Sequence, residues 1–244
     1  MAISNDARDR VKKVGEPIAL FLGRLGLTPD GLTLIGFVIT VTGAALLGLQ
    51  LWLVGGLVVF AGGLFDMFDG TLARATGRVS RLGAFMDSVF DRWGEALVYV
   101  GLVWGTLDLG LWRPVVLAAA AMAAAFMVSY TRAKAEGLGF SAGSGMAAVG
   151  LAPREVRVVI LTLGLVVAGL LPGFPEDTET PGALAYPLSA LALEGALGLI
   201  AILGTVTVVQ RILHIRGQAR QQARADAMNA ALDATTTEAG KRAS

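Results

Sequence analysis

Four aspartates lie close together in the sequence, inside or beside two long apolar segments. They are Asp66, Asp69, Asp87 and Asp91, within the stretch FDMFDGTLARATGRVSRLGAFMDSVFDRWGE. An ionised carboxylate at the centre of a bilayer costs roughly 2.5 kcal/mol or more, so four of them require an explanation. Because hard cations prefer oxygen ligands, these side chains are candidates for binding Mg²⁺, Mn²⁺ or Ca²⁺.

The spacing of the aspartates arranges them in two pairs. Asp66 and Asp69 are three residues apart, and Asp87 and Asp91 are four apart, so on helices the members of each pair share a face. If the two helix ends meet, the four carboxylates form a cluster that is too repulsive to stay ionised without a cation. The sequence contains no cysteine and a single histidine, His214, far along the chain, which argues against zinc.

The residues around the aspartates form a longer pattern, D-G-x2-A-R-x8-G-x3-D-x3-D, with Asp66 three residues upstream. Its other fixed positions are Gly70, Ala73, Arg74 and Gly83. The two glycines allow a nucleotide or a neighbouring helix to approach the backbone closely, and Arg74 can pair with a phosphate or orient a carboxylate. The alternative is that the acids are salt-bridge partners of nearby arginines, but four acids at metal-ligand spacing exceed what packing requires.

This pattern resembles the signature of the CDP-alcohol phosphotransferase family, integral-membrane enzymes that join an alcohol to a phosphatidyl group and release CMP. All eight fixed positions match. The resemblance implies that Asp66, Asp69, Asp87 and Asp91 bind two Mg²⁺ or Mn²⁺ ions, and that Asp91 is the general base. It also implies a binding site for the CDP-lipid, formed by Asp30, Thr33, Asp66, Gly70 and Arg74.

Further segments resemble the branch of this family that uses inositol phosphate as the acceptor. They are GLTPD, SYTRAKAEGLG, GLAPREVRVVIL and VVQRILHIR. In that branch basic residues hold the phosphate of the acceptor, a role that maps onto Lys134, Arg154 or Arg157, and Arg211. The resemblance therefore implies transfer of a phosphatidyl group from CDP-diacylglycerol to inositol 1-phosphate, giving phosphatidylinositol phosphate and CMP in phospholipid biosynthesis. Glycerol 3-phosphate and serine are the alternative acceptors.

Two other classes of membrane protein also use acidic clusters. Intramembrane prenyltransferases bind a diphosphate through aspartates and Mg²⁺, but the D-G-x2-A-R arrangement with its fixed spacer argues against them. A divalent-cation transporter needs carboxylates near the middle of the membrane with access from both sides. We expect these aspartates at one face, which disfavours a transporter.

The composition is that of a polytopic membrane protein. Of the 244 residues 55% are apolar, and the mean hydropathy of +0.66 is too high for an ordinary soluble domain. About 20 residues are needed to cross about 30 Å of hydrocarbon. Six apolar segments near that length predict an all-α protein with six transmembrane helices, at residues 31–49, 52–74, 83–106, 113–135, 154–172 and 188–213.

We expect three parts in the chain. Residues 1–25 mix charges with apolar residues at helical spacing, which predicts an amphipathic helix at the membrane interface or, alternatively, a soluble cap helix. Residues 26–216 form the six-helix catalytic domain, and residues 217–244 form a polar cytoplasmic tail.

Lys and Arg residues indicate the orientation. They gather before the first apolar segment, after the second and fourth, and after the last. The positive-inside rule therefore places both termini and the aspartates in the cytoplasm of a plasma-membrane protein. The expected partners are CDP-diacylglycerol, inositol phosphate, membrane lipids and, by resemblance, a second copy of the chain, with no nucleic acid.

Overall fold

The computed structural model describes residues 16–140, 149–171 and 188–242, with side chains described up to residue 230. Within these residues the chain is all-helical, as predicted, and contains no strand. A short helix over residues 16–24 comes first. Six longer helices follow: α2 (Pro29–Gly48), α3 (Trp52–Ala75), α4 (Arg81–Asp108), α5 (Trp112–Gly137), α6 (Arg154–Leu170) and α7 (Leu188–Arg242).

Helix caps fix the starts of the helices that carry the aspartates and their neighbours. The Thr28 side chain accepts a hydrogen bond from the Gly31 backbone N–H at 3.1 Å and begins α2. Ser80 accepts one from the Gly83 N–H at 2.9 Å and begins α4. Each cap satisfies a backbone donor that the first turn of a helix leaves unpaired. Between α3 and α4 the chain turns through Gly77, whose φ of +66° lies in the left-handed region that glycine adopts most easily.

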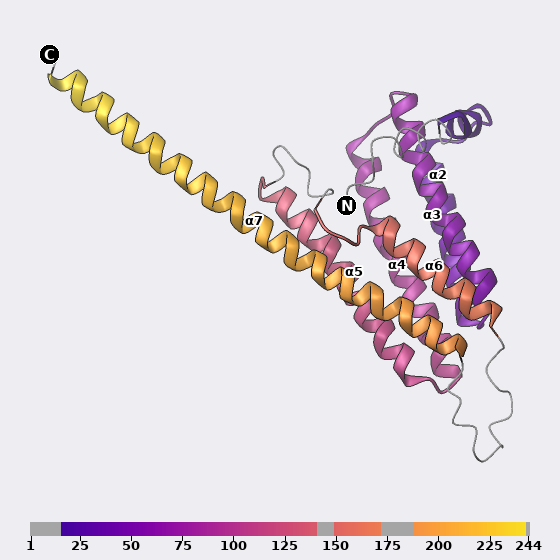
Figure 1. Ribbon diagram of the computed structural model, residues 1–244. Coiled ribbons are helices and arrows are strands. Elements are labelled where there is room, and N and C mark those ends of the chain that lie inside the picture. Colours follow the sequence, from indigo (N-terminus) through magenta and orange to yellow (C-terminus); the bar gives the residue numbers. More distant parts are fainter. Residues whose placement is uncertain (1–15, 141–148, 172–187, 243–244) are drawn as a thin grey trace.

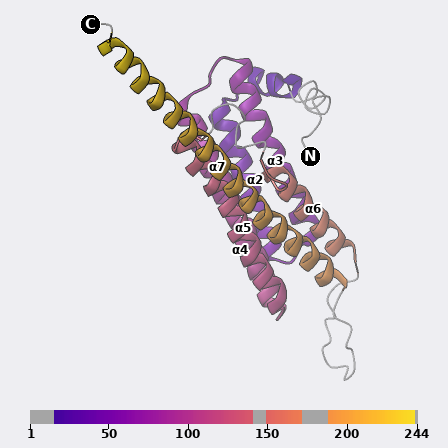
Figure 2. The ribbon, with the colours of Figure 1, turned by 60° about the vertical axis from the view of Figure 1, so that its left-hand side comes forward.

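The six helices form a closed ring. Each packs against two neighbours, in the order α2, α3, α6, α7, α5, α4 and back to α2. The ribbon in Figure 1 shows α2, α3, α4, α5 and α6 as one bundle, with α7 lying diagonally across it and running well beyond it. The turned view in Figure 2 shows the same long extension of α7. Buried apolar residues from all six helices, such as Leu47, Leu102, Leu165 and Leu197, fill the inside of the ring.

Four of these helices, α2, α3, α5 and α7, are long and apolar enough to cross a membrane. Of the other two, α6 has only 17 residues, and α4 carries charged residues of the site described below. Large apolar side chains such as Leu57, Leu163 and Ile202 are more than half exposed on the outside of the ring. The chain is therefore a membrane protein with an all-helical fold, and six spans remain a prediction.

The predicted N-terminal helix and C-terminal tail agree with the structure to different degrees. Residues 16–24 of the predicted N-terminal helix are helical, and Ala19 packs with Leu32 and Leu72 of α2 and α3. Residues 1–15 lie outside the described residues. At the other end α7 continues without a break from the bundle through Gly217 to Arg242, so no change of structure marks the expected start of the tail.

Candidate active site

The structure brings the two aspartate pairs together at one end of the ring. Asp66 and Asp69 lie near the end of α3, and Asp87 and Asp91 near the start of α4. The carboxylates are close enough to interact across the pairs, Asp69 with Asp87 and Asp91 with Asp66. The turn through Gly77 is what folds one helix end back toward the other. The meeting of two helix ends that the spacing required is therefore present.

Arg154, the first residue of α6, bridges the two pairs. Its Nη1 lies 2.6 Å from Oδ2 of Asp66 and 2.5 Å from Oδ1 of Asp91. In the described part of the chain no three acidic or histidine side chains converge on a single point. One cationic group is thus shared by carboxylate oxygens from α3 and α4, those of Asp66 and Asp91. Oxygen donors of this kind fit a hard divalent cation.

Asp69 is held in a fixed orientation by two donors. The Thr33 hydroxyl on α2 donates a hydrogen bond to Oδ2 of Asp69 at 2.5 Å, and the backbone N–H of Gly70 donates to its Oδ1. The side chain is buried, with 5% exposed. Outer contacts of this type orient a metal-binding carboxylate and tune its affinity. Thr33 therefore contacts the acidic cluster directly, in addition to lining the cavity described next.

A cavity of about 290 Å³ opens on one side of the aspartates, between α2, α3 and α4. Four of the five residues predicted to bind the CDP-lipid line it, and the fifth, Asp66, does not; the four are Asp30, Thr33, Gly70 and Arg74. Gly83 also lines this cavity. A Cβ atom there would lie 3.2 Å from Oδ1 of Asp30 and 2.9 Å from Oγ of Ser80. The glycine of the motif thus keeps this wall open.

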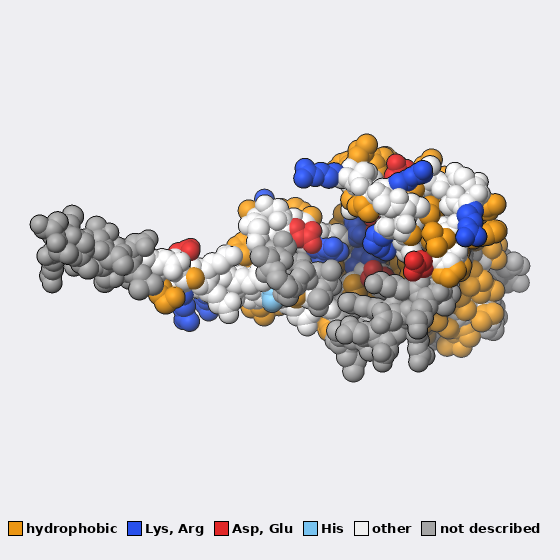
Figure 3. All heavy atoms as spheres, turned by 90° about the horizontal axis from the view of Figure 1, so that it is seen from above, with side chains coloured by type: hydrophobic (Ala, Val, Ile, Leu, Met, Phe, Trp, Pro, Cys, Tyr) orange, Lys and Arg blue, Asp and Glu red, His pale blue; other side chains and the backbone are white. Residues whose placement is uncertain are grey.

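A second cavity, of about 540 Å³, opens on the other side and is rich in arginine. Five arginines line it, together with Asp87 and Asp91: Arg92, Arg132, Arg154, Arg157 and Arg211. Seen from above in Figure 3, basic and acidic side chains gather around a hollow at this end of the molecule, and hydrophobic side chains cover the flank. Such a cavity can take a small anionic molecule, because guanidinium groups bind phosphate in pairs of hydrogen bonds.

The arginine-lined cavity includes three of the four residues predicted to bind the acceptor. Arg154, Arg157 and Arg211 line it, whereas Lys134 is exposed and is not among its lining residues. Arg92 and Arg132 also line this cavity but were not among the residues predicted to bind the acceptor. Arg132 lies in the basic segment SYTRAK and Arg92 directly follows Asp91, so both positions carried a usable signal.

The two cavities meet at the acidic cluster. Asp87 lines both of them. Asp69 lines the smaller cavity and Asp91 the arginine-rich one. The aspartates therefore form the boundary between two binding spaces, and a molecule in each would meet the other at the carboxylates.

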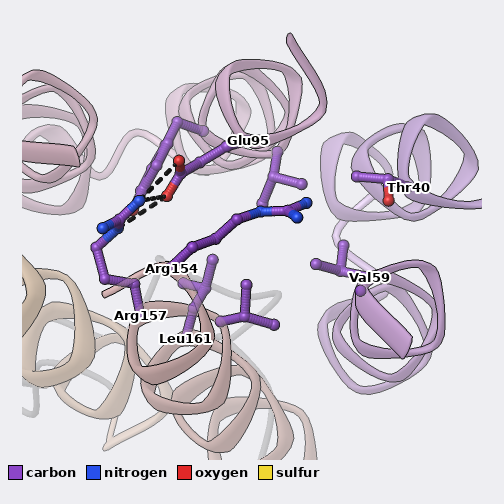
Figure 4. A pocket seen from close by; sticks show the side chains of 10 residues that line it. Thr40, Val59, Glu95, Arg154, Arg157 and Leu161 are labelled. Carbon is purple, nitrogen blue, oxygen red and sulfur yellow. Dashed lines mark hydrogen bonds and ion pairs between the residues drawn. The ribbon is translucent and has the colours of Figure 1, made fainter. Parts of the chain in front are cut away.

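Each of the three guanidinium nitrogens of Arg157 has a hydrogen-bond partner inside the protein. It donates from Nε and Nη2 to the two carboxylate oxygens of Glu95, each at 2.9 Å, and from Nη1 to the Ala152 carbonyl at 2.8 Å. Glu95 also accepts from Arg92 at 3.2 Å. Figure 4 shows the Glu95–Arg157 pair joined by dashed lines, while Arg154 extends away from it, toward the side of Thr40 and Val59. The sequence analysis did not name Glu95, although it follows Asp91 by one helical turn.

Helix α7 positions the segment that carries these arginines. Arg211 donates from Nε to the Val149 carbonyl at 3.0 Å and from Nη1 to the Val128 carbonyl. The Thr207 hydroxyl accepts from the backbone N–H groups of Leu151 and Ala152, both at 3.0 Å. These contacts fasten the segment before α6 to α5 and α7. Arg211 thus stabilises the position of this segment and also lines the arginine-rich cavity.

The sequence matches a known family over most of its length. The profile of the CDP-alcohol phosphatidyltransferase family matches residues 26–209. The archaetidylinositol phosphate synthase of Pyrococcus horikoshii is 40% identical over 154 residues, which is 63% of this chain and 77% of that protein. The phosphatidylinositol phosphate synthase of Mycobacteroides abscessus is 33% identical over 214 residues, or 86% of this chain and 87% of that one.

Solved structures agree with the sequence matches. The phosphatidylinositol phosphate synthase of Mycobacterium tuberculosis with CDP-DAG bound superposes with a TM-score of 0.67 at 29% identity, covering 83% of this chain and 94% of that one. The same enzyme in complex with manganese and citrate gives a TM-score of 0.65 at 30% identity, covering 82% and 88%.

Proposed function

The chain belongs to the CDP-alcohol phosphatidyltransferase family, and on that premise we propose that it transfers a phosphatidyl group from CDP-diacylglycerol to inositol 1-phosphate. A hydroxyl oxygen of the acceptor attacks the phosphorus next to the lipid. The bond from that phosphorus to CMP breaks, and the hydroxyl proton passes to a carboxylate of the protein. The products are phosphatidylinositol phosphate and CMP.

One observation carries this proposal: two cavities of different character meet at Asp87. The smaller cavity holds Asp30, Thr33 and Arg74 and is our site for the CDP-lipid. The larger holds five arginines, and we assign it to the doubly charged phosphate of the acceptor. A transfer reaction between two anionic molecules requires such an arrangement, because the reacting atoms must meet at a common boundary.

We place two Mg²⁺ or Mn²⁺ ions on Asp66, Asp69, Asp87 and Asp91. When bound, such ions neutralise the diphosphate and stabilise the charge that develops on the transferred phosphoryl group. The protein contributes the orientation of these ligands. Thr33 and the Gly70 N–H fix Asp69, and burial in the ring limits the access of water.

Asp91 is our candidate for the general base. It lines the arginine-rich cavity, where the acceptor hydroxyl would lie. Its Oδ1 contacts Arg154, and its Oδ2 lies 3.4 Å from Nη2 of Arg92. The contact with Arg92 lies on the side of the arginine-rich cavity, whereas Asp69 lines the smaller cavity. A base must lie within hydrogen-bond reach of the proton it removes.

For the acceptor phosphate we propose Arg154 and Arg211 as the main ligands, with Lys134 as a further one by resemblance. Arg157 would act mainly through its charge, since all three of its nitrogens already have partners. On this proposal Arg154, rather than Arg157, makes the direct contact with the phosphate.

We further propose that all six helices cross the plasma membrane, with both termini and the active site in the cytoplasm. The aspartates and both cavities lie at one end of the ring, together with Arg74, Arg78 and Arg132 of the basic segments that follow α3 and end α5, which agrees with the positive-inside rule. Residues 1–25, 26–216 and 217–244 then form an interfacial helix, the catalytic domain and a cytoplasmic tail. A homodimer is proposed from the family resemblance.

The test is an acceptor-selection assay. Purified protein is incubated with CDP-diacylglycerol and Mn²⁺, and inositol 1-phosphate, free inositol, glycerol 3-phosphate and serine are offered separately, with CMP release as the readout. We expect release with inositol 1-phosphate and none in EDTA. Release only with glycerol 3-phosphate or serine would keep the family chemistry and reject the acceptor. Full activity in EDTA would reject the metal sites.

A further inference from the structure

Arg154 and a metal ion would compete for the same oxygen atoms. Its Nη1 contacts Oδ2 of Asp66 and Oδ1 of Asp91 at 2.6 and 2.5 Å. Both carboxylates belong to the proposed metal site, and a metal ion bound directly to these oxygens cannot share the space that this nitrogen fills. The guanidinium therefore supplies the positive charge of the site in the structure described here, and a metal ion at those oxygens requires that it leave.

The side chain of Arg154 also has free space beside it into which it can move. It lines the arginine-rich cavity, its side chain is 19% exposed, and its Nε is buried without a hydrogen-bond partner. Arg157, three residues further along α6, has partners for all three of its nitrogens. A long side chain at the first position of a helix can change rotamer without disturbing the backbone. The arginine-rich cavity is the space into which it can turn.

We propose that Arg154 is a movable counter-ion that joins Asp66 to Asp91 while the aspartates hold no metal, and turns into the arginine-rich cavity when metal binds. There it adds a guanidinium to the site for the acceptor phosphate. Metal binding then strengthens acceptor binding, and by linkage the acceptor strengthens metal binding to the same degree. This favours loading of the metals and CDP-lipid before the acceptor. The inference rests on the proposed function.

The first test measures Mn²⁺ affinity without any substrate. The full-length protein in detergent is titrated with Mn²⁺ and the free ion is followed by electron paramagnetic resonance. Because Arg154→Ala removes the competitor, it should bind Mn²⁺ roughly tenfold or more tightly than wild type, the equivalent of about 1.4 kcal/mol. Arg154→Gln, which keeps most of the volume, should change in the same direction and serves if the alanine variant does not fold.

Arg132→Ala is the matched control. Arg132 lines the same cavity and pairs with Glu136 at 2.9 Å. Its removal takes the same charge from the same space without freeing an aspartate of the motif. We expect its Mn²⁺ affinity to stay within about threefold of wild type, as for a largely screened charge. If Arg132→Ala and Arg154→Ala raise the Mn²⁺ affinity equally, the loss of any nearby positive charge would explain the effect, and the proposal would be rejected.

The second test measures the coupling itself. In wild type the dissociation constant of inositol 1-phosphate should fall about fivefold or more when Mn²⁺ is added, the usual size of a coupling between two sites. In Arg154→Ala and Arg154→Gln it should not respond to Mn²⁺. Failure of wild type to bind Mn²⁺ at all would reject the proposed function, whereas Mn²⁺ binding that is unchanged or weaker in both variants would reject the counter-ion alone.

Discussion

Glu95 and Arg157, which are 62 residues apart in the sequence, form a bidentate ion pair inside the helix ring. Both of its hydrogen bonds are 2.9 Å long. Arg157 is 1% exposed and Glu95 is 9% exposed. Glu95 also binds Arg92, which reaches Asp91. A chain of alternating charges therefore runs from the proposed base to the wall of the acceptor cavity. The pair joins α4 to α6 across the ring.

Glu95→Gln should disrupt both stability and acceptor binding. Removing one partner of a buried ion pair leaves the other charge uncompensated, at a cost of about 3 to 5 kcal/mol in the free energy of unfolding. Arg157 and Arg92 would then lose their orientation, and the KM for inositol phosphate should rise. Thermal unfolding in detergent and steady-state kinetics measure the two effects. Asp108→Asn, at the exposed far end of α4, is the control, and an equal melting temperature in the two variants would contradict the role of Glu95.

Thr33→Val should weaken metal binding, because Asp69 would lose the hydroxyl that orients it. Loss of such an outer contact typically costs 10- to 100-fold in metal affinity. Valine keeps the shape of threonine, so packing should change little. Thr33→Ser restores the hydroxyl and should recover the Mn²⁺ affinity. If valine and serine bind Mn²⁺ equally well, the hydrogen bond to Asp69 has no part in the site.

The local pattern of the sequence was enough to locate the helices and the acidic cluster. All six predicted segments contain one helix, and the limits of the first five agree within about two residues. Hydropathy locates the helices because each predicted segment is apolar over about the length of one helix, although only α2, α3, α5 and α7 among the described helices are long and apolar enough to cross a membrane. The D-x2-D and D-x3-D spacing predicted that the members of each aspartate pair share one face of their helix, α3 or α4.

Contacts between distant segments could not be predicted in the same way. The ring order of the helices, the pairing of Glu95 with Arg157, and the fastening of residues 151 and 152 by Thr207 depend on residues more than 50 positions apart. A threonine inside an apolar segment carries no local signal of such a role. The bridge from Arg154 to the aspartates is equally non-local, which is why the sequence could not separate Arg154 from Arg157.

Asparagine at Asp91 and at Asp66 should have different effects. Asp91 lines the arginine-rich cavity and is our candidate for the general base. Asp91→Asn should therefore abolish turnover while CDP-diacylglycerol still binds. Asp66 lines neither of the two cavities, and its proposed role is metal binding, so Asp66→Asn should lose Mn²⁺ and with it the CDP-lipid. Turnover and lipid binding are measured on the same preparations. Normal turnover in Asp91→Asn would remove this carboxylate from the mechanism.

The contact between α2 and α4 should be intolerant of even one added methyl group. A Cβ atom at Gly101 would lie 2.1 Å from the backbone oxygen of Ala44, and a backbone atom cannot turn away as a side chain can. Gly101→Ala should therefore cost about 1 to 3 kcal/mol. Gly195→Ala on α7, where nothing lies within 4 Å, should be neutral or slightly stabilising. Equal melting temperatures would contradict the close approach of these helices.

Alanine substitutions of Arg211 and Lys134 should differ in their effect on stability, because Arg211 has structural contacts and Lys134 adds only charge. Arg211→Ala loses its bonds to the Val149 and Val128 carbonyls, so it should lower the melting temperature and raise the KM for inositol phosphate. Lys134 is exposed, so Lys134→Ala should leave stability unchanged.

The size of the acceptor effect follows from the phosphate contact that each side chain would make. One charge-assisted contact contributes about 1.5 to 3 kcal/mol, so either variant should raise the KM for inositol phosphate roughly 10- to 100-fold. The KM for CDP-diacylglycerol should hardly change, because the cavity that we assign to its diphosphate lies on the other side of the aspartates. Arg220→Ala, exposed on α7 beyond the bundle, is the control. An unchanged KM in Lys134→Ala would mean that Lys134 only contributes to membrane orientation through its positive charge. An unchanged KM in Arg211→Ala would remove Arg211 from the acceptor site. Neither outcome would affect the chemistry proposed for the aspartates.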